Sequence, residues 1–192
     1  MDKEFDVVIV GGGPVGLWLA CELALAKVKV VVLERRTERV VQSRALAIHG
    51  RTLEVFALRG LADRFLARGR PVPSMHFGAL DTRLDFSVID TRFPFMLLLP
   101  QATTETLLEE RALEIGVNVR RGHFVETVEQ DANHVVISGR NREVPFRFSA
   151  RYVVGADGAR SKVRRAAPIE FVGHPARHTM MLGDVVLDAP PS

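Results

Sequence analysis

The chain opens with short apolar runs that flank a segment of helical periodicity. Residues 5–10 and 28–33 are short, continuous and β-branched, which indicates buried parallel strands. Between them, apolar residues recur at the spacing of one helix face: Leu17, Ala20, Cys21, Ala24 and Leu25. Pro14 stands near the first position of this helix, where its missing N–H costs nothing. The pattern therefore predicts a strand–helix–strand unit of about 30 residues.

The middle of the chain changes character at Pro71 and Pro73. Before these prolines, residues 36–49 are mostly polar and loop-like, and residues 52–58 and 61–67 predict two short helices. After them, three apolar pieces predict short strands over residues 75–80, 84–88 and 95–99. This stretch indicates the start of a second, sheet-based region.

The second half of the chain predicts one helix and then a series of strands. The helix begins at Gln101 and is ended by Gly116. One of its faces carries Thr104, Leu108, Ala112 and Ile115. Alternating segments then predict an antiparallel meander over residues 117–120, 123–129, 134–138 and 144–149, with turns at 131–133 and 139–141. Two further strands are predicted over residues 151–155 and 179–188. The fold class is therefore α/β.

Composition narrows the class of protein. The chain is 47% hydrophobic and 26% charged, and no apolar run approaches the ~20 residues that span a bilayer, so no membrane partner is expected. No secretory signal is visible, and the single cysteine, Cys21, excludes an internal disulfide, which together favour a cytoplasmic location. Cys21 lies on the apolar helix face, where we expect a packed thiol. The six histidines are dispersed, so no metal is expected.

The charge pattern favours a phosphate-bearing cofactor over nucleic acid. The net charge is +3, and 22 of the 26 basic residues are arginines that are scattered rather than clustered. A nucleic-acid partner is therefore not expected, whereas positive potential suits a cofactor that carries phosphates.

A glycine-rich loop follows the first strand. Gly11 allows a tight turn, Gly13 lets the backbone approach a pyrophosphate, and Gly16 lets the helix pack closely. Together with Pro14 and Val15, these residues form a helix N-terminus that offers free N–H groups to an anion. A purely structural turn has the same composition, but the flanking strand and helix favour dinucleotide binding.

An acidic residue ends the second strand. Glu34 follows Gly16 by 18 residues, and a carboxylate there accepts hydrogen bonds from ribose hydroxyls and repels a 2′-phosphate. The pattern indicates FAD or NAD rather than NADP in this site. Arg35 lies against the adenine or is a solvated surface charge, and we favour the cofactor role only slightly.

A second turn of the same kind follows the strand at 151–155. Asp157 and Gly158 stand at the carboxyl end of that strand, and Ser161 can cap a short helix. By itself this motif is also compatible with an ordinary tight turn.

Together these motifs resemble the FAD-dependent aromatic hydroxylases, single-component flavoprotein monooxygenases typified by 4-hydroxybenzoate 3-monooxygenase. That family pairs an N-terminal GxGxxG with a central Asp-Gly fingerprint, and between them it carries an Arg-Ala pair, as in Arg44-Ala45, and a Gln at the head of a helix, as in Gln101. The finer resemblance is to members acting on aromatic polyketides and rifamycin- or tetracycline-like compounds. It rests on residues 43–45, 49–56, 59–61, 99–101, 104–105 and 108–109.

The resemblance implies roles for individual residues. Glu34 would hold the FAD ribose, Arg44 and Gln101 would face the pyrophosphate and ribityl chain, and the backbone of Val125 would read the adenine. Asp157 and Gly158 would serve both FAD and NADPH. The expected cofactor-binding residues are Gly11, Gly13, Pro14, Val15, Gly16, Glu34, Arg35, Arg44, Ala45, Gln101, Val125, Asp157 and Gly158, and no catalytic acid or base is named.

The resemblance also implies the domain organisation. We expect a Rossmann-like FAD-binding domain with a parallel sheet and an antiparallel meander crossover over residues 1–70 and 100–168, and part of a β-sheet substrate domain over 71–99 and 169–192. Gly183-Asp184 has the same two residues as the family's third fingerprint, a Gly-Asp pair that holds the flavin ribityl chain. Here the pair lies in the middle of a predicted strand, so it is expected to be part of the substrate sheet. Family members are more than twice this long, so the chain is expected to be an N-terminal part that retains FAD weakly, is inactive alone and exposes apolar sheet surface that favours homo-oligomers.

The reaction implied is aromatic hydroxylation. NADPH or NADH reduces FAD, reduced flavin adds O2 to form a C4a-hydroperoxide, and this species hydroxylates a phenolic polycyclic substrate. The alternatives are a related flavoprotein, such as an antibiotic-inactivating monooxygenase, a reductase or a halogenase, and a truncated, non-catalytic nucleotide-binding module. Three residues that face the substrate or the core equally well are Phe93, Phe95 and Met96.

Overall fold

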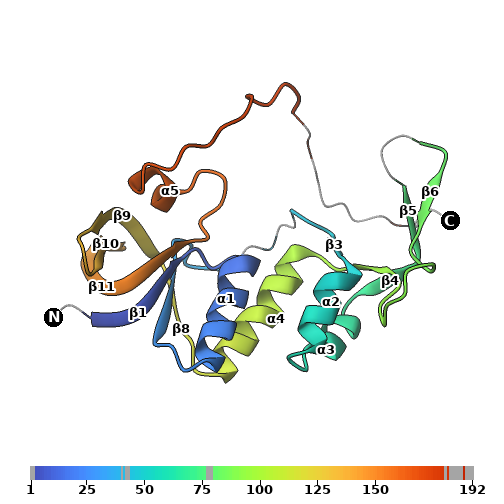
Figure 1. The fold of residues 1–192 in the computed structure, drawn as a ribbon, viewed down its shortest axis with the longest axis horizontal. Coiled ribbons are helices and arrows are strands. Elements are labelled where there is room, and N and C mark those ends of the chain that lie inside the picture. The colour runs from blue at the N-terminus through green and yellow to red at the C-terminus, as the bar shows by residue number, and fades with distance from the viewer. Residues whose placement is uncertain are drawn as a thin grey trace. The chain divides into compact units, whose positions relative to one another are not determined.

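The computed structural model describes residues 3–39, 41, 44–76, 80–179, 181 and 188. The chain forms two compact units, one made of Met1–Arg39 and Leu108–Arg177 and the other of Val40–Leu107 and His178–Ser192 (Figure 1). Most of the predicted strand at 179–188, with Gly183-Asp184, lies outside the described residues. Among the described residues, no helix has the length and apolar character needed to cross a membrane.

The first unit is built on a six-stranded mixed sheet of order β8-β2-β1-β11-β10-β9. Its strands are β1 (Lys3–Val10), β2 (Val30–Glu34), β8 (Asn118–Arg121), β9 (His123–Gln130), β10 (Val135–Asn141) and β11 (Val144–Gly155). Strand β1 pairs in parallel with β2 and β11, and β2 pairs in parallel with β8, whereas β10 is antiparallel to β11 and β9. The α/β class and the parallel strand–helix–strand start are confirmed.

Helices cover one face of this sheet. The side chains of Ile9 and Val32 pack with Ala20 and Cys21 of α1 (Pro14–Leu25) and with Ala112 of α4 (Gln101–Glu114). Most of the apolar α1 stripe is buried as predicted, although Leu25 is 43% exposed. Because successive strand residues point to opposite faces, the intervening side chains of β1 and β2 build a second core.

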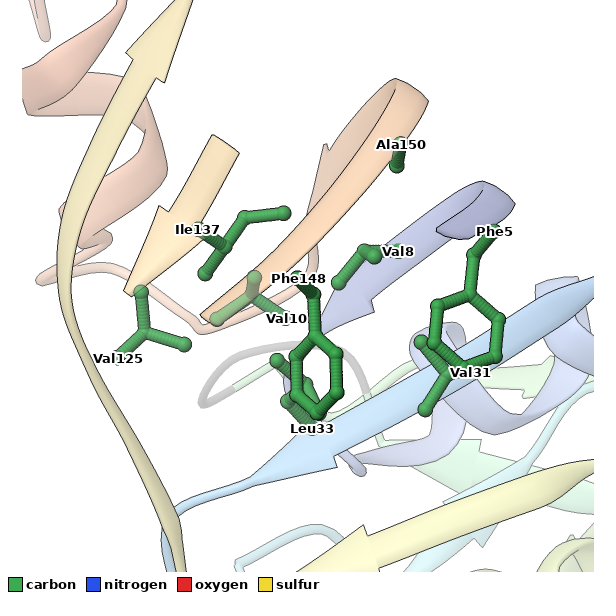
Figure 2. Close-up of a cluster of buried hydrophobic side chains, with 9 residues drawn as sticks. All are labelled: Phe5, Val8, Val10, Val31, Leu33, Val125, Ile137, Phe148 and Ala150. Atoms are coloured by element: carbon green, nitrogen blue, oxygen red, sulfur yellow. The ribbon is translucent and has the colours of Figure 1, made fainter. Parts of the chain in front are cut away.

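That second core lies between the parallel strands and the meander (Figure 2). Phe5 and Phe148 meet edge to face with their ring centroids 5.7 Å apart. The other buried members are Val8, Val10, Val31, Leu33, Val125, Ile137 and Ala150, and Val163 of α5 (Lys162–Ala166) packs against them. Burial on both faces explains why the strands read as continuous apolar runs.

Two strand predictions in this sheet are wrong. Residues 117–120 were expected in the antiparallel meander, but Asn118–Arg121 forms β8, which pairs in parallel with β2. The two strands expected at 144–149 and 151–155 are one strand, β11, whose first part pairs with β10 and whose last part pairs with β1. A four-residue edge strand has the same local pattern in either orientation, so only the distant partner decides.

The second unit contains short elements. Helices α2 (Gly50–Ala57) and α3 (Ala62–Leu66) confirm the two predicted short helices, and the rings of Phe56 and Phe65 pack 4.4 Å apart. Strands β3 (Ala47–Ile48), β7 (Met96–Leu98) and β4 (Arg70–Val72) form one sheet, and β5 (Ser74–His76) and β6 (Arg83–Asp85) form another. Phe93 and Met96, for which core and substrate roles were open, are buried.

We expect the thiol of Cys21 to be unreactive in the folded chain. It is 2% exposed, its Sγ donates to the Leu108 carbonyl at 3.9 Å, and burial raises its pKa to about 11. At pH 8 the thiolate fraction is then about 100-fold below that of an ordinary cysteine. Labelling with a thiol reagent at pH 8 checks this: the native chain reacts at least about 100-fold more slowly than the urea-unfolded chain. Equal rates would contradict the packed thiol.

Candidate dinucleotide site

The glycine-rich loop connects β1 to α1 at the carboxyl end of the parallel strands. The Gly11 N–H donates to the Leu33 carbonyl at 2.8 Å, which ties the loop to β2. Pro14 opens the helix as predicted, and Gly13 is its N-cap residue. Among the described residues, no side-chain hydrogen bond caps this helix, and the first N–H groups of a helix have no intrahelical acceptor, which suits an anion.

The three glycines of the GxGxxG motif, Gly11, Gly13 and Gly16, differ in what an added Cβ would meet. Gly11 has φ +112°, and a Cβ there would strike the Ala156 carbonyl oxygen. A Cβ on Gly16 would strike the Gly11 carbonyl oxygen. A Cβ on Gly13 would meet nothing within 4 Å. The protein's own packing therefore requires glycine at positions 11 and 16. At Gly13 the space beside the backbone is open, so a ligand can approach the main chain there.

The Glu34 carboxylate is fixed beside this loop by two backbone N–H groups. Its Oε2 accepts from Gly12 N at 2.8 Å, and its Oε1 accepts from Arg36 N at 2.9 Å. Each oxygen keeps a further lone pair for a hydroxyl donor. The carboxylate is half-buried and held in one orientation, which suits a ribose diol. Arg35, the next residue, is exposed.

The Asp-Gly turn lies next to the glycine loop. Ala156 N donates to the Val10 carbonyl at 2.8 Å, directly before Asp157. Oδ2 of Asp157 accepts from Lys162 N at 2.6 Å, and its Oδ1 is buried without a hydrogen-bond partner among the described residues. Gly158 has φ +82°, which favours glycine. Ser161 caps α5 as predicted, with its Oγ accepting from Arg164 N at 3.0 Å.

Helix α5 also connects this turn to β9. Lys162 Nζ donates to the Glu126 carbonyl at 2.9 Å, directly after Val125. The pairing of β9 with β10 shifts at this point, so Glu126 is the extra residue of a bulge. The side chain of Val125 is buried, and the structure thus links the predicted adenine-reading strand to the Asp-Gly turn.

Three predicted residues belong to the second unit. Gln101 N donates to the Ala45 carbonyl at 2.9 Å, and Gln101 Nε2 donates to Glu105 Oε1 at 2.8 Å. The structure therefore brings Ala45 and Gln101 together although they lie far apart in the sequence. Arg44 is exposed beside them in the chain.

Two features of the first unit were missed from the sequence. A cavity of about 620 Å³ is lined by Gly122, His123, Asn141 and Phe146 among others, and by none of the predicted site residues. A buried carboxylate, Glu109, is paired with two arginines. No local signal marks the cavity. Helical spacing places Glu109 next to the apolar face of α4. A glutamate in a helix rich in charged residues would nevertheless be predicted to be exposed.

The fold and the loop geometry together define the class of protein. Parallel strands, a glycine turn at a helix N-terminus and an anchored acid at the end of the next strand are the parts of a dinucleotide-binding domain. The open space at Gly13 and the unpartnered Asp157 oxygen fit such a cofactor. The profile of the family described as "FAD binding domain" matches residues 4–192, and the chain belongs to that family.

Relatives of this chain include monooxygenases. The chain is 47% identical to the uncharacterized aromatic compound monooxygenase YhjG of Bacillus subtilis (strain 168), over 100% of this chain and 38% of the relative. It is 44% identical to rifampicin monooxygenase of Streptomyces venezuelae, over 96% of this chain and 38% of the relative. The resemblance to polyketide- and rifamycin-type hydroxylases is confirmed.

A solved structure gives the same picture. The OxyS anhydrotetracycline hydroxylase from Streptomyces rimosus superimposes with a TM-score of 0.88 at 46% identity, over 90% of this chain and 36% of that one. The chain thus spans between a third and two fifths of the length of the proteins it matches.

Proposed function

We propose that the protein is an FAD-dependent monooxygenase that hydroxylates phenolic, polycyclic aromatic compounds and takes its electrons from NADPH or NADH. The observation that carries this proposal is the Glu34 carboxylate, fixed by Gly12 and Arg36 beside an open glycine loop. Such a carboxylate accepts from an unphosphorylated adenosine ribose, as in FAD. The names of the relatives, which include aromatic-compound and rifampicin monooxygenases, support the substrate class.

The residues of the first unit would hold the ADP half of FAD. Glu34 binds the ribose, the N–H groups of Gly13 to Gly16 with the α1 N-terminus neutralise the pyrophosphate, and Val125 lies on the strand assigned to the adenine. The buried, unpartnered Oδ1 of Asp157 accepts from a donor supplied by the cofactor or by water. Arg35, exposed after Glu34, is a candidate for the adenine side.

The residues of the second unit would serve the flavin half. On the strength of the family resemblance, we assign Arg44, Ala45 and Gln101 to the ribityl and pyrophosphate region. The hydrogen bond from Gln101 N to the Ala45 carbonyl is compatible with a shared role of these two residues. The redox chemistry, which accepts electrons from NAD(P)H and activates O2, is supplied by the flavin when it is bound. The chain's own part is to bind and orient.

Purification of the protein that carries this chain tests the proposal. We expect a yellow protein with one flavin per chain, and NADPH or NADH oxidation that a phenolic polycyclic compound stimulates. Mass spectrometry of the product is expected to show one added oxygen atom. A colourless protein, or NAD(P)H oxidation that no aromatic compound stimulates, contradicts the assignment.

A second candidate is an antibiotic-inactivating monooxygenase. The observation that favours it is the 44% identity to rifampicin monooxygenase. Incubation with rifampicin and NADPH separates the two: loss of antibacterial activity with a single added oxygen favours inactivation, whereas turnover of simpler phenolic polyketides alone favours a biosynthetic hydroxylase.

A further inference from the structure

A buried carboxylate, Glu109, lies in the same unit as Glu34, the residue proposed to bind the ribose. We propose that Glu109, acting through Arg39 and Arg121, is a positioning residue that holds the segment 35–39 and thereby orients the Glu34 carboxylate. This inference rests on the proposed FAD function of Glu34. All of these residues belong to the first unit.

The three charged groups form a close cluster in which the carboxylate is buried, the Arg121 side chain is 20% exposed and the Arg39 side chain is 41% exposed. Glu109 is 5% exposed, and its Oε2 lies 2.6 Å from Arg39 Nε and 2.8 Å from Arg121 Nη2. Its Oε1 accepts from Arg121 Nε at 2.9 Å, so the arginine binds in a fork. Burial alone would raise the pKa of the Glu109 carboxyl, but the hydrogen bonds from Arg121 and Arg39 outweigh it and the pKa is lowered. The carboxylate is therefore charged at neutral pH.

The segment 35–39 contains no helix or strand. The hydrogen bonds that hold it come from the Glu109 cluster and from Gly122, the residue after Arg121. Gly122 N donates to the Arg36 carbonyl at 3.0 Å, and Arg121 Nη1 donates to the Glu38 carbonyl at 3.4 Å. The far end is held by Arg39 on Glu109.

The near end of the segment is the ribose carboxylate itself. Arg36 N donates to Glu34 Oε1, so the residue whose carbonyl is anchored by Gly122 also orients Glu34 through its N–H. Hydrogen bonds, connected through the backbone of residues 121–122 and of Arg36, thus link Glu109 to Glu34.

Stability alone does not explain a charged cluster here. A buried ion pair is often no more stabilising than apolar residues of the same volume, because desolvation offsets the attraction. Directional hydrogen bonds, however, fix a loop in one conformation, which apolar contacts do less well. The geometry therefore favours a positioning role, in which the cluster holds the segment 35–39 and with it Arg36, whose N–H binds Glu34.

The test compares two neutralising variants of α4 in the protein that carries this chain. Glu109→Gln is expected to weaken FAD binding about tenfold, since it removes charge-assisted bonds that hold the loop. Glu110→Gln makes the same chemical change at an exposed neighbour and leaves the affinity unchanged. In a double variant with Glu34→Gln, the two effects combine to less than their product, because both act through one contact. Independent, fully multiplicative effects would overturn the proposal.

A cofactor-free measurement keeps the proposal separate from the proposed function. Amide hydrogen exchange at Arg36 and Gly12, whose N–H groups bind Glu34, becomes faster in Glu109→Gln and stays unchanged in Glu110→Gln. If the unmodified protein binds no FAD, the proposed function fails and the exchange result still decides the positioning role. Unchanged exchange refutes that role.

A milder variant guards against misfolding. Should Glu109→Gln not fold, Arg39→Gln carries the same measurements, because the Arg39 side chain is 41% exposed and its loss leaves Arg121 on Glu109. If the charge of Arg39 is what matters, Arg39→Lys is expected to bind FAD more tightly than Arg39→Gln. If Arg39 acts only by packing, the two variants are expected to bind FAD equally weakly.

Discussion

Replacing Gly11 by alanine is expected to destabilise the first unit by about 2–5 kcal/mol and to abolish dinucleotide binding. The backbone at this position has φ +112°, which a side chain disfavours, and the new Cβ would strike the Ala156 carbonyl oxygen. Relief of the clash moves β11 and the Asp-Gly turn away from the loop, because Ala156 N is bound to Val10 in the same place. Urea unfolding monitored by circular dichroism measures the loss.

Gly13→Ala is the matched control for this prediction. Gly13 has φ −79°, which alanine adopts freely, and its Cβ would meet no protein atom within 4 Å. We expect a stability change within about 0.5 kcal/mol. Dinucleotide affinity nevertheless falls, because the methyl group occupies the space where the pyrophosphate approaches. A Gly13→Ala variant with unchanged affinity would place the phosphate elsewhere, and a stable Gly11→Ala variant would contradict the packing argument.

The parts of the fold that could be predicted are those specified by neighbours in the sequence. The apolar run of β1, the glycine turn and the α1 stripe lie within 25 residues, and their pattern determined their structure. Strand β8 was assigned wrongly because its partner, β2, lies more than 80 residues away. Strand β11 was predicted as two strands because its first part pairs with β10 and its last part pairs with β1. The alternation of apolar and polar residues does not reveal that one strand has both partners.

The candidate site divides in the same way. The glycine loop and Glu34 follow from local spacing, and Gly12 binding to Glu34 gives them a shared geometry. That the Asp-Gly turn touches the loop depends on β1 pairing with β11, which the sequence does not display. The Glu109 cluster joins residues from a loop, a helix and a strand that are distant in the sequence. The periodicity of a single element therefore could not predict it.

Neutralising Glu34 is expected to weaken FAD binding about 10- to 100-fold, the equivalent of one or two charge-assisted hydrogen bonds. Glu34→Gln keeps the side-chain shape but supplies one acceptor oxygen where the carboxylate supplies two. The N–H of Gly12 or of Arg36 then faces an amide donor, and the ribose loses a charged acceptor. Isothermal titration with FAD in the protein that carries this chain measures the change.

The charge of Glu34 also predicts a change of ligand preference that separates recognition from folding. We expect the unmodified protein to prefer ADP to 2′-phospho-ADP, because the carboxylate would repel the extra phosphate, and we expect Glu34→Gln to narrow this preference. Asp6→Asn serves as the control, since Asp6 is a half-buried residue in the middle of β1 whose carboxylate accepts from Lys29 N at 2.9 Å and lies outside the glycine loop. It makes the same change of charge and is expected to alter neither affinity nor preference. Equal behaviour of the two variants would show that overall charge, and not a ribose contact at Glu34, governs binding.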